Sequence, residues 1–150
     1  MHVSTWVVVA LLAVMGGVAS ADEVFDGDTM EIWGQRTCLY GIDAFELNQT
    51  CLNAQGKPWR CGIAAKATLA ARIEGEALDC LVVEEDQDGC YLSRCRGNDG
   101  TDLGAYMVRS GLALPSTGDY LVEEADARRR GAGAWEGEFM PPWQWRLDAR

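Results

Sequence analysis

Two short acidic segments hold the residues most suited to chemistry. The first is Asp26-Gly27-Asp28-Thr29, and the second runs from Gly41 through Asp43 and Ala44 to Glu46. Hard divalent cations bind several oxygen ligands, which carboxylates supply, and a further carboxylate beside them can orient or deprotonate a water molecule. The pattern indicates a site for a hard metal and a phosphate. Asp-Gly-Asp-Thr can also be purely structural, because it makes a tight turn with local side-chain hydrogen bonds.

Histidine chemistry is excluded from the body of the chain. The single histidine is His2, within a segment that we expect to be removed. A Ser-His-Asp triad, a Cys-His pair and histidine-ligated zinc all need an imidazole. Acid–base work must therefore come from carboxylates, tyrosine or one of the two lysines, Lys57 and Lys66.

The N-terminal segment resembles a secretory signal peptide. Residues 1–21 carry no formal charge apart from His2, residues 6–14 are almost wholly apolar, and Ala19-Ser20-Ala21 is a small-x-small cleavage site. We predict cleavage after Ala21 and one domain over residues 22–150, exported to the periplasm or secreted. Because no Lys or Arg lies near Met1, a retained membrane anchor is the alternative. No later segment is long and apolar enough to cross a bilayer.

The net charge of −10 opposes tight binding of nucleic acid. Nucleic-acid binders usually present a basic patch, because neutralising phosphates releases counterions. The only dense basic run is Arg128-Arg129-Arg130, and at the end of a helix these charges would complement the helix dipole. We favour that structural interpretation of the run. The expected partner is an unidentified protein or a small anion, and the oligomeric state is open.

The remaining pattern predicts a small antiparallel sheet with helices between and after its strands, an α+β fold. We expect a hairpin of residues 29–33 and 36–42 and a second hairpin of residues 77–85 and 91–96. Helices are expected over residues 61–73, 103–110 and 120–130. In the first helix, Ile63, Ala67, Ala70 and Ile73 form the expected packing stripe, and Asp119 is the expected cap of the third. The tail from Trp135 to Trp145 should pack back as an apolar strap.

All six cysteines lie after Ala21, an even number that fits a disulfide framework in an oxidising compartment. If Asp86 pairs with Gly89 across a two-residue turn, Cys80 falls opposite Cys95, within reach of a disulfide. Cys51 and Cys61 flank one loop and form a second pair. Cys38 and Cys90 are then left as a third pair by elimination.

The ordered motifs resemble the staphylococcal-nuclease (thermonuclease) family. They are Asp26-Gly27-Asp28-Thr29, then Leu39 to Glu46, Cys61-Gly62, Asp86-x-x-Gly89, Val108-x-x-Gly111-Leu112-Ala113 and Trp135, and they cover about residues 24–146. The resemblance implies a five-stranded OB-fold barrel with three helices. It also implies calcium-dependent cleavage of phosphodiester bonds in DNA and RNA.

The resemblance also implies roles for single residues. Asp28, Asp43 and the backbone carbonyl of Ala44 match the calcium ligands, and Asp26 matches a neighbouring acidic residue that tunes the cluster. Glu46 matches the carboxylate that orients or deprotonates the attacking water. Without the phosphate of a substrate as an added ligand, we expect calcium to bind weakly.

Two positions depart from the family, because cysteine replaces a phosphate-binding arginine at Cys38 and again at Cys90. Loss of one such donor costs about 3–4 kcal/mol of transition-state stabilisation. We therefore expect an exported, catalytically impaired pseudo-nuclease that acts as a binding or interaction module, with a Cys38–Cys90 disulfide across the former active site. The alternative is an active calcium-dependent nuclease with substitute arginines such as Arg36 or Arg94. Each lies one pleat, about 6.8 Å, from the position it would replace. A guanidinium from elsewhere beside the acidic residues would favour this alternative.

Overall fold

The computed structural model describes residues 21–149, so the predicted signal segment lies outside the described residues except for Ala21. The strands are β1 (Ala21–Val24), β2 (Thr29–Ile32), β3 (Gln35–Leu39), β4 (Ile42–Ala44), β5 (Cys51–Leu52), β6 (Pro58–Trp59), β7 (Asp79–Glu85), β8 (Tyr91–Arg96) and β9 (Ala113–Pro115). The helices are α1 (Cys61–Ile73), α2 (Leu103–Arg109), α3 (Leu121–Arg130) and α4 (Pro142–Asp148), with one 3-10 turn, η1 (Gly133–Glu136).

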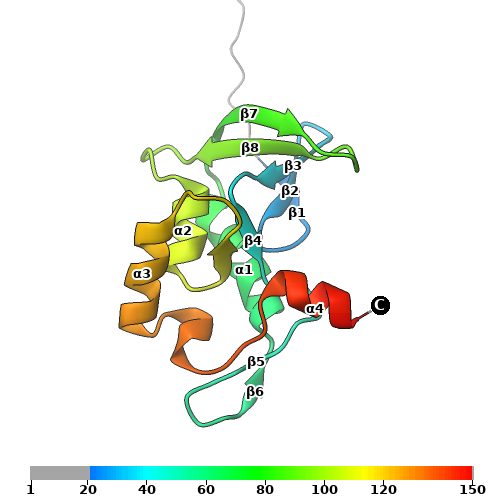
Figure 1. Cartoon of the computed structure of the whole chain (residues 1–150). Coiled ribbons are helices and arrows are strands. Elements are labelled where there is room, and N and C mark those ends of the chain that lie inside the picture. Colours follow the sequence, from blue (N-terminus) through cyan, green and yellow to red (C-terminus); the bar gives the residue numbers. More distant parts are fainter. Residues whose placement is uncertain (1–20, 150) are drawn as a thin grey trace, which may run out of the picture.

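The main sheet has five strands in the order β1-β2-β3-β8-β7. Its β3–β8 pair is parallel and its other pairs are antiparallel. Figure 1 shows β7 and β8 across one end of the molecule and the helices below them. The pairs β4–β9 and β5–β6 form two small separate sheets.

The mixed α+β class is confirmed, but the expected closed barrel with three helices is wrong in two respects. Over the described residues, β1 and β7 are the unpaired edges of an open sheet. There are also four α-helices in this part of the chain, because α4 forms within and beyond the tail that we expected to be only an apolar strap. Pro142 lies in the first turn of α4, where proline is favoured, and this signal of a helix start was not used in the prediction.

The hairpin of β2 and β3 turns where the sequence predicts. Trp33 and Gly34 have φ of 52° and 73°, and two consecutive positive values are typical of the tight turns that join antiparallel strands. Thr29 pairs with Cys38 at the far end of the same ladder. The turn therefore fixes which residues of β3 lie beside the acidic Asp26–Thr29 segment.

Helix α1 has the predicted bounds, but its predicted packing stripe is wrong except for Ile73. The buried positions are Cys61, Gly62, Ala65, Leu69 and Ile73, whereas Ile63 is 38% exposed. Both sets repeat at helical spacing, so periodicity alone could not choose between them.

Gly62 shows why the helix presents the face that it does. A Cβ atom at this position would lie within 2 Å of the backbone oxygen of Glu46, so the start of α1 packs directly against the loop that carries Glu46. A second close approach occurs at Gly27, where a Cβ would meet Ala65 of α1 at 2.6 Å and Ala44 of β4 at 2.8 Å. Glycine at both positions lets α1 hold the two acidic segments together.

The second hairpin places Cys80 opposite Cys95 as predicted, but by a different route. Its loop is one residue longer than expected, since Asp86 donates its N–H to the carbonyl of Cys90 at 2.9 Å. An irregularity between Val82 and Glu84 shifts the register by one residue and restores the pairing of the two cysteines.

The caps of α2 and α3 differ. The Asp102 side chain accepts the N–H of Ala105 at 2.9 Å and caps α2. Asp119 does not cap α3, which starts after Tyr120 in a left-handed conformation without a side-chain cap. Asp119 instead accepts hydrogen bonds from Thr117 and Arg94, both at 2.9 Å.

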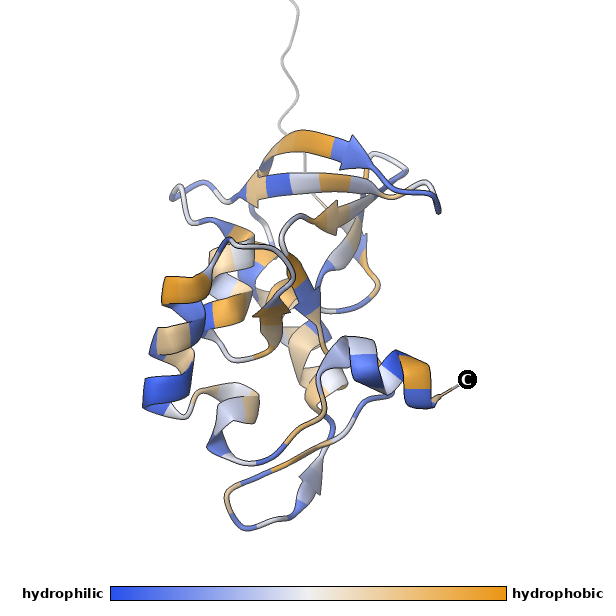
Figure 2. Ribbon diagram, in the orientation of Figure 1, coloured by the Kyte–Doolittle hydropathy of each residue, from blue (hydrophilic) through white to orange (hydrophobic). Residues whose placement is uncertain are grey.

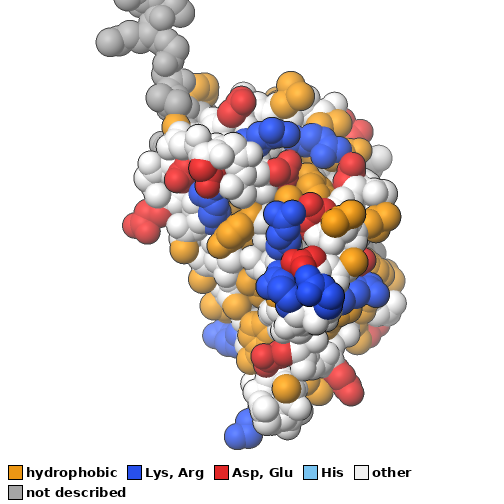
Figure 3. Space-filling view, turned by 90° about the vertical axis from the view of Figure 1, so that its left-hand side faces the viewer, with side chains coloured by type: hydrophobic (Ala, Val, Ile, Leu, Met, Phe, Trp, Pro, Cys, Tyr) orange, Lys and Arg blue, Asp and Glu red, His pale blue; other side chains and the backbone are white. Residues whose placement is uncertain are grey.

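The arginine run at the end of α3 is neutralised by acidic residues of the same helix. Arg128 pairs with Glu124, whereas Arg129 and Arg130 both pair with Asp126. In Figure 3, basic side chains gather over this part of the surface with acidic ones beside them. This arrangement fits the structural interpretation of the run.

The buried apolar side chains form two clusters. The larger one packs the main sheet against α1 and α2, with Met30, Leu69, Leu103 and Met107 fully buried. The smaller one joins Phe45 to Cys51, Cys61 and Ala134 beneath the C-terminal tail, with Phe139 against it. Figure 2 shows the apolar segments of strands and helices at the centre of the molecule, and a further one along β7, where Leu81 is 70% exposed. Over residues 21–149, no helix has the length and hydrophobicity required to span a membrane.

Candidate functional site

Asp26 organises the turn between β1 and β2. Its Oδ1 accepts the backbone N–H of Asp28 at 3.0 Å and that of Thr29 at 2.8 Å. This is the local side-chain turn that the sequence offered as a structural interpretation. Asp26 therefore positions Asp28 through the backbone and adds a negative charge next to it.

Asp28 connects the turn to β4. Its Oδ2 accepts the backbone N–H of Ala44 at 2.7 Å, and its Oδ1 accepts the Thr29 hydroxyl at 2.9 Å. Burial, and after it the charge of Asp26, raises the pKa of the Asp28 carboxyl to about 7. The hydrogen bond from Ala44 opposes this shift. A carboxyl group that resists ionisation until neutral pH gains from a nearby cation.

The backbone carbonyl of Ala44 points toward the side of β4 on which Asp28 lies, as a metal ligand at this position would need. Phe45 donates its N–H to Leu112 at 3.4 Å, across to the chain of β9. Successive residues of a strand direct their backbone groups to opposite edges, so the N–H and the carbonyl of Ala44 both face the Asp28 side. Two carboxylates and this carbonyl are the kinds of oxygen donor that calcium prefers, so the chemistry of these donors fits such an ion.

The site also contains an arginine that the sequence analysis missed. Arg146 of α4 donates from Nη1 to Asp43 Oδ1 at 2.8 Å and from Nη2 to Asp43 Oδ2 at 2.8 Å. Its Nη1 also contacts Oε1 of Glu46. The hydrogen bonds with Asp43, and after them those with Glu46, raise the pKa of the Arg146 guanidinium above its ordinary value. Figure 1 shows α4 near the C-terminus, alongside the segment that carries these carboxylates.

The two arginines proposed as substitutes from the sequence are engaged elsewhere. Arg36 stacks on the ring of Phe25, 5.3 Å from its centroid. Arg94 pairs with Asp119 at 2.9 Å and lies 4.8 Å from the ring centroid of Tyr40. Among the described residues, the ion pairs of Asp43 and Glu46 are made by Arg146.

The three disulfides join the same pairs that were named from the sequence. They are Cys38–Cys90, Cys51–Cys61 and Cys80–Cys95, with Cα–Cα distances of 5.9, 5.7 and 4.0 Å. The first lies next to the acidic turn, since the sulfur of Cys38 is 3.8 Å from the Thr29 hydroxyl. Asp86 approaches the same sulfur atoms, but a disulfide offers no thiolate to bind a metal.

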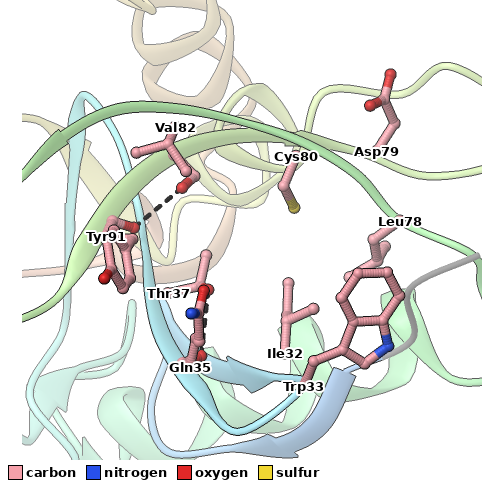
Figure 4. Close-up of a pocket in the computed structure, with 10 residues that line it drawn as sticks. Ile32, Trp33, Gln35, Thr37, Leu78, Asp79, Cys80, Val82 and Tyr91 are labelled. Carbon is pink, nitrogen blue, oxygen red and sulfur yellow. Dashed lines mark hydrogen bonds between the residues drawn. The ribbon is translucent and has the colours of Figure 1, made fainter.

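A cavity of about 400 Å³ lies on the sheet, lined by other residues than this acidic group. Figure 4 shows Ile32 of β2 and Trp33 of the turn that follows it on one side of the cavity, with the Cys80 side chain of β7 directed toward Ile32 from the other. Its wall combines apolar side chains with polar ones such as Gln35, Thr37 and Ser93, and its one carboxylate is Asp79. This cavity lacks the paired carboxylates that phosphodiester chemistry requires, so we assign the candidate site to the acidic group under α4.

Comparisons with known proteins indicate a nuclease-like family. No family model matches the chain. The succinoglycan biosynthesis protein ExoI of Rhizobium meliloti is 32% identical over 77% of this chain, which spans 63% of the length of that relative. An uncharacterized endonuclease of Escherichia coli O157:H7 is 26% identical over 82% of this chain and 80% of its own length, as is one of Escherichia coli. The chain is thus similar to proteins named as endonucleases over most of its length.

Proposed function

We propose that this chain is a metal-dependent phosphodiesterase of the staphylococcal-nuclease type, built on an OB-like sheet, that cleaves nucleic acid outside the cytoplasm. The observation that carries this proposal is the connected group of Asp28, Ala44, Asp43 and Glu46 with a guanidinium beside it. The similarity to proteins named as endonucleases supports the reaction class. The guanidinium is the feature that the sequence analysis named as favouring an active enzyme.

The roles follow from the chemistry of each group. Asp28, Asp43 and the Ala44 carbonyl would hold calcium, with Asp26 behind them, and such an ion would neutralise charge on the phosphate that is attacked. Glu46 would orient or deprotonate the attacking water. Its backbone is fixed by Gln49, whose Oε1 accepts the Glu46 N–H at 3.1 Å. The carboxylate therefore stands on a rigid turn, as positioning of a water requires.

The test is cleavage of a single-stranded oligodeoxynucleotide by the purified protein in calcium and in chelator. We expect cleavage in calcium only, and a loss of at least about a hundredfold for Glu46→Gln, since general base catalysis contributes about 10²–10⁴. Glu85→Gln, at an exposed position of β7, is the matched control and should keep wild-type activity. Equal rates for wild type and Glu46→Gln would refute the proposal.

The second candidate is a catalytically impaired binding module for a protein or a small anion. The Cys38–Cys90 disulfide favours it, because the disulfide lies beside Thr29 and occupies the two positions where the resembled family has its phosphate-binding arginines. On this alternative, wild type is inactive and a Cys38→Arg, Cys90→Arg double variant gains cleavage. Activity in the wild type would exclude it.

A further inference from the structure

Arg146 lies where two carboxylates of the candidate site meet. Its guanidinium spans both oxygens of Asp43 and reaches Glu46 with the same Nη1. The side chain of Asp43 is 15% exposed and that of Arg146 is 44% exposed. One side of the guanidinium is therefore bound to the protein while the rest of the side chain faces solvent, from which a phosphate would arrive.

The position of Arg146 is fixed by the segment that carries it, the C-terminal strap of residues 138–148. Within it, the carbonyl of Met140 accepts the side-chain N–H of Gln49 at 2.7 Å. Gln49 is fully buried, and its other side-chain atom accepts the N–H of Glu46. One buried amide thus connects the strap directly to the residue that Arg146 contacts.

Further contacts dock the strap on both sides of this amide. The ring of Phe139 packs edge-on against Phe45 with centroids 5.3 Å apart, and against Trp135 at 4.7 Å. Beyond it, the indole N–H of Trp145 donates to Asn48 at 3.1 Å. These anchors lie before and next to Arg146 in the sequence, so α4 has a defined orientation over the residue 45–49 loop.

We infer that Arg146 is the phosphate-binding cation of this site, delivered by the strap in place of the two arginines that cysteines replace. A guanidinium fork matches phosphate as well as carboxylate, in each case through two parallel hydrogen bonds. In the structure the fork is occupied by Asp43. Arg146 and a divalent cation would compete for the two Asp43 oxygens, so in the loaded site the fork is available to a phosphate. This inference rests on the proposed function for the role of the phosphate.

The test compares Arg146→Gln and Arg146→Lys with wild type by calorimetric titration. Calcium alone is titrated first, and then adenosine 5′-phosphate in the presence of calcium. We expect Arg146→Gln to bind calcium at least threefold more tightly, since a competing cation is removed, and to bind the nucleotide at least tenfold more weakly. Arg146→Lys keeps the positive charge but loses the two parallel N–H donors. Its affinity for each probe should therefore lie between that of wild type and that of Arg146→Gln.

Arg36→Gln is the matched control, because it removes the same charge from the exposed residue that stacks on Phe25. It should titrate like wild type with both probes. If Arg146→Gln binds the nucleotide as wild type does, or if wild type does not bind it, Arg146 is an internal counter-ion only and the inference is wrong. Cleavage separates the two proposals: an inactive wild type whose nucleotide binding depends on Arg146 would refute the enzyme but not the phosphate site.

Discussion

At the scale of single residues, Asp28 carries the clearest electrostatic signature of the site. Its carboxyl is half-buried, next to Asp26, and its pKa rises from 3.8 in the unfolded chain to about 7. Between these pH values the folded state holds a proton that the unfolded state has released. The contribution of Asp28 to stability is therefore complete below about pH 4 and is lost as the pH rises through about 7.

Replacing Asp28 with Asn should remove this pH dependence. In chelator, we expect the free energy of unfolding of wild type to fall between pH 5 and pH 8 by about 2.6 kcal/mol more than that of Asp28→Asn, since about two pH units of this range lie below the raised pKa of about 7 and each is worth about 1.4 kcal/mol. Urea unfolding at both pH values measures it, with Asp88→Asn in the β7–β8 loop as the control. Parallel pH profiles for wild type and Asp28→Asn would contradict the shift.

At the level of elements, the docking of the C-terminal strap determines whether Arg146 stays in the candidate site. Gln49 holds the strap to the residue 45–49 loop with two buried hydrogen bonds. Gln49→Leu leaves the N–H of Glu46 and the carbonyl of Met140 without these partners, and each buried unpaired group costs about 1–3 kcal/mol. We expect a loss of about 3 kcal/mol in the free energy of unfolding. Gln55→Leu, at an exposed loop position, should change it little; an equal effect of both variants would argue against the anchor.

The disulfides stabilise the elements around the site to different degrees. Cys38–Cys90 closes 52 residues and Cys51–Cys61 closes 10. On a chain-entropy account these loops correspond to about 4 and about 3 kcal/mol. The Cys38→Ser, Cys90→Ser variant should therefore lose more stability in chemical unfolding than the Cys51→Ser, Cys61→Ser variant. The opposite order would show that packing around the smaller cluster, not chain entropy, determines the difference.

For the whole molecule, sequence patterns predicted local structure well and long-range structure only in part. The bounds of α1 follow from its residue pattern. Cys80 does lie opposite Cys95, but only because an irregularity in β7 offsets a loop that is one residue longer than the predicted turn. The buried face of α1 could not be predicted from the residue pattern, because two faces of the helix carry apolar residues. Only tertiary packing, such as the close contact at Gly62, determines which of the two faces is buried. The contact of Arg146 with Asp43 could not be predicted for the same reason. The two residues are 103 positions apart in the sequence, and they come together through a helix whose docking depends on the buried Gln49.

From the charge of the whole molecule we predict how strongly the binding of nucleic acid depends on salt. The net charge is −10, and the arginine run of α3 is already paired with Glu124 and Asp126. Within residues 21–149, Arg146 is the guanidinium that we expect to contact the phosphate backbone, because it is the one that binds the carboxylates of the candidate site. A single contact gives a slope of about −0.7 for log affinity against log salt on single strands.

Fluorescence anisotropy of a labelled oligodeoxynucleotide, with Glu46→Gln in calcium to prevent cleavage, measures this slope. Between 50 and 200 mM KCl we expect affinity to fall about threefold, whereas proteins with six or more phosphate contacts lose about a thousandfold or more. Arg129→Gln, at a side chain 73% exposed, should leave the slope unchanged. A steep slope that this substitution reduces would mean that α3 supplies a second, basic contact surface, and that the acidic surface is less of a barrier to nucleic acid than its charge implies.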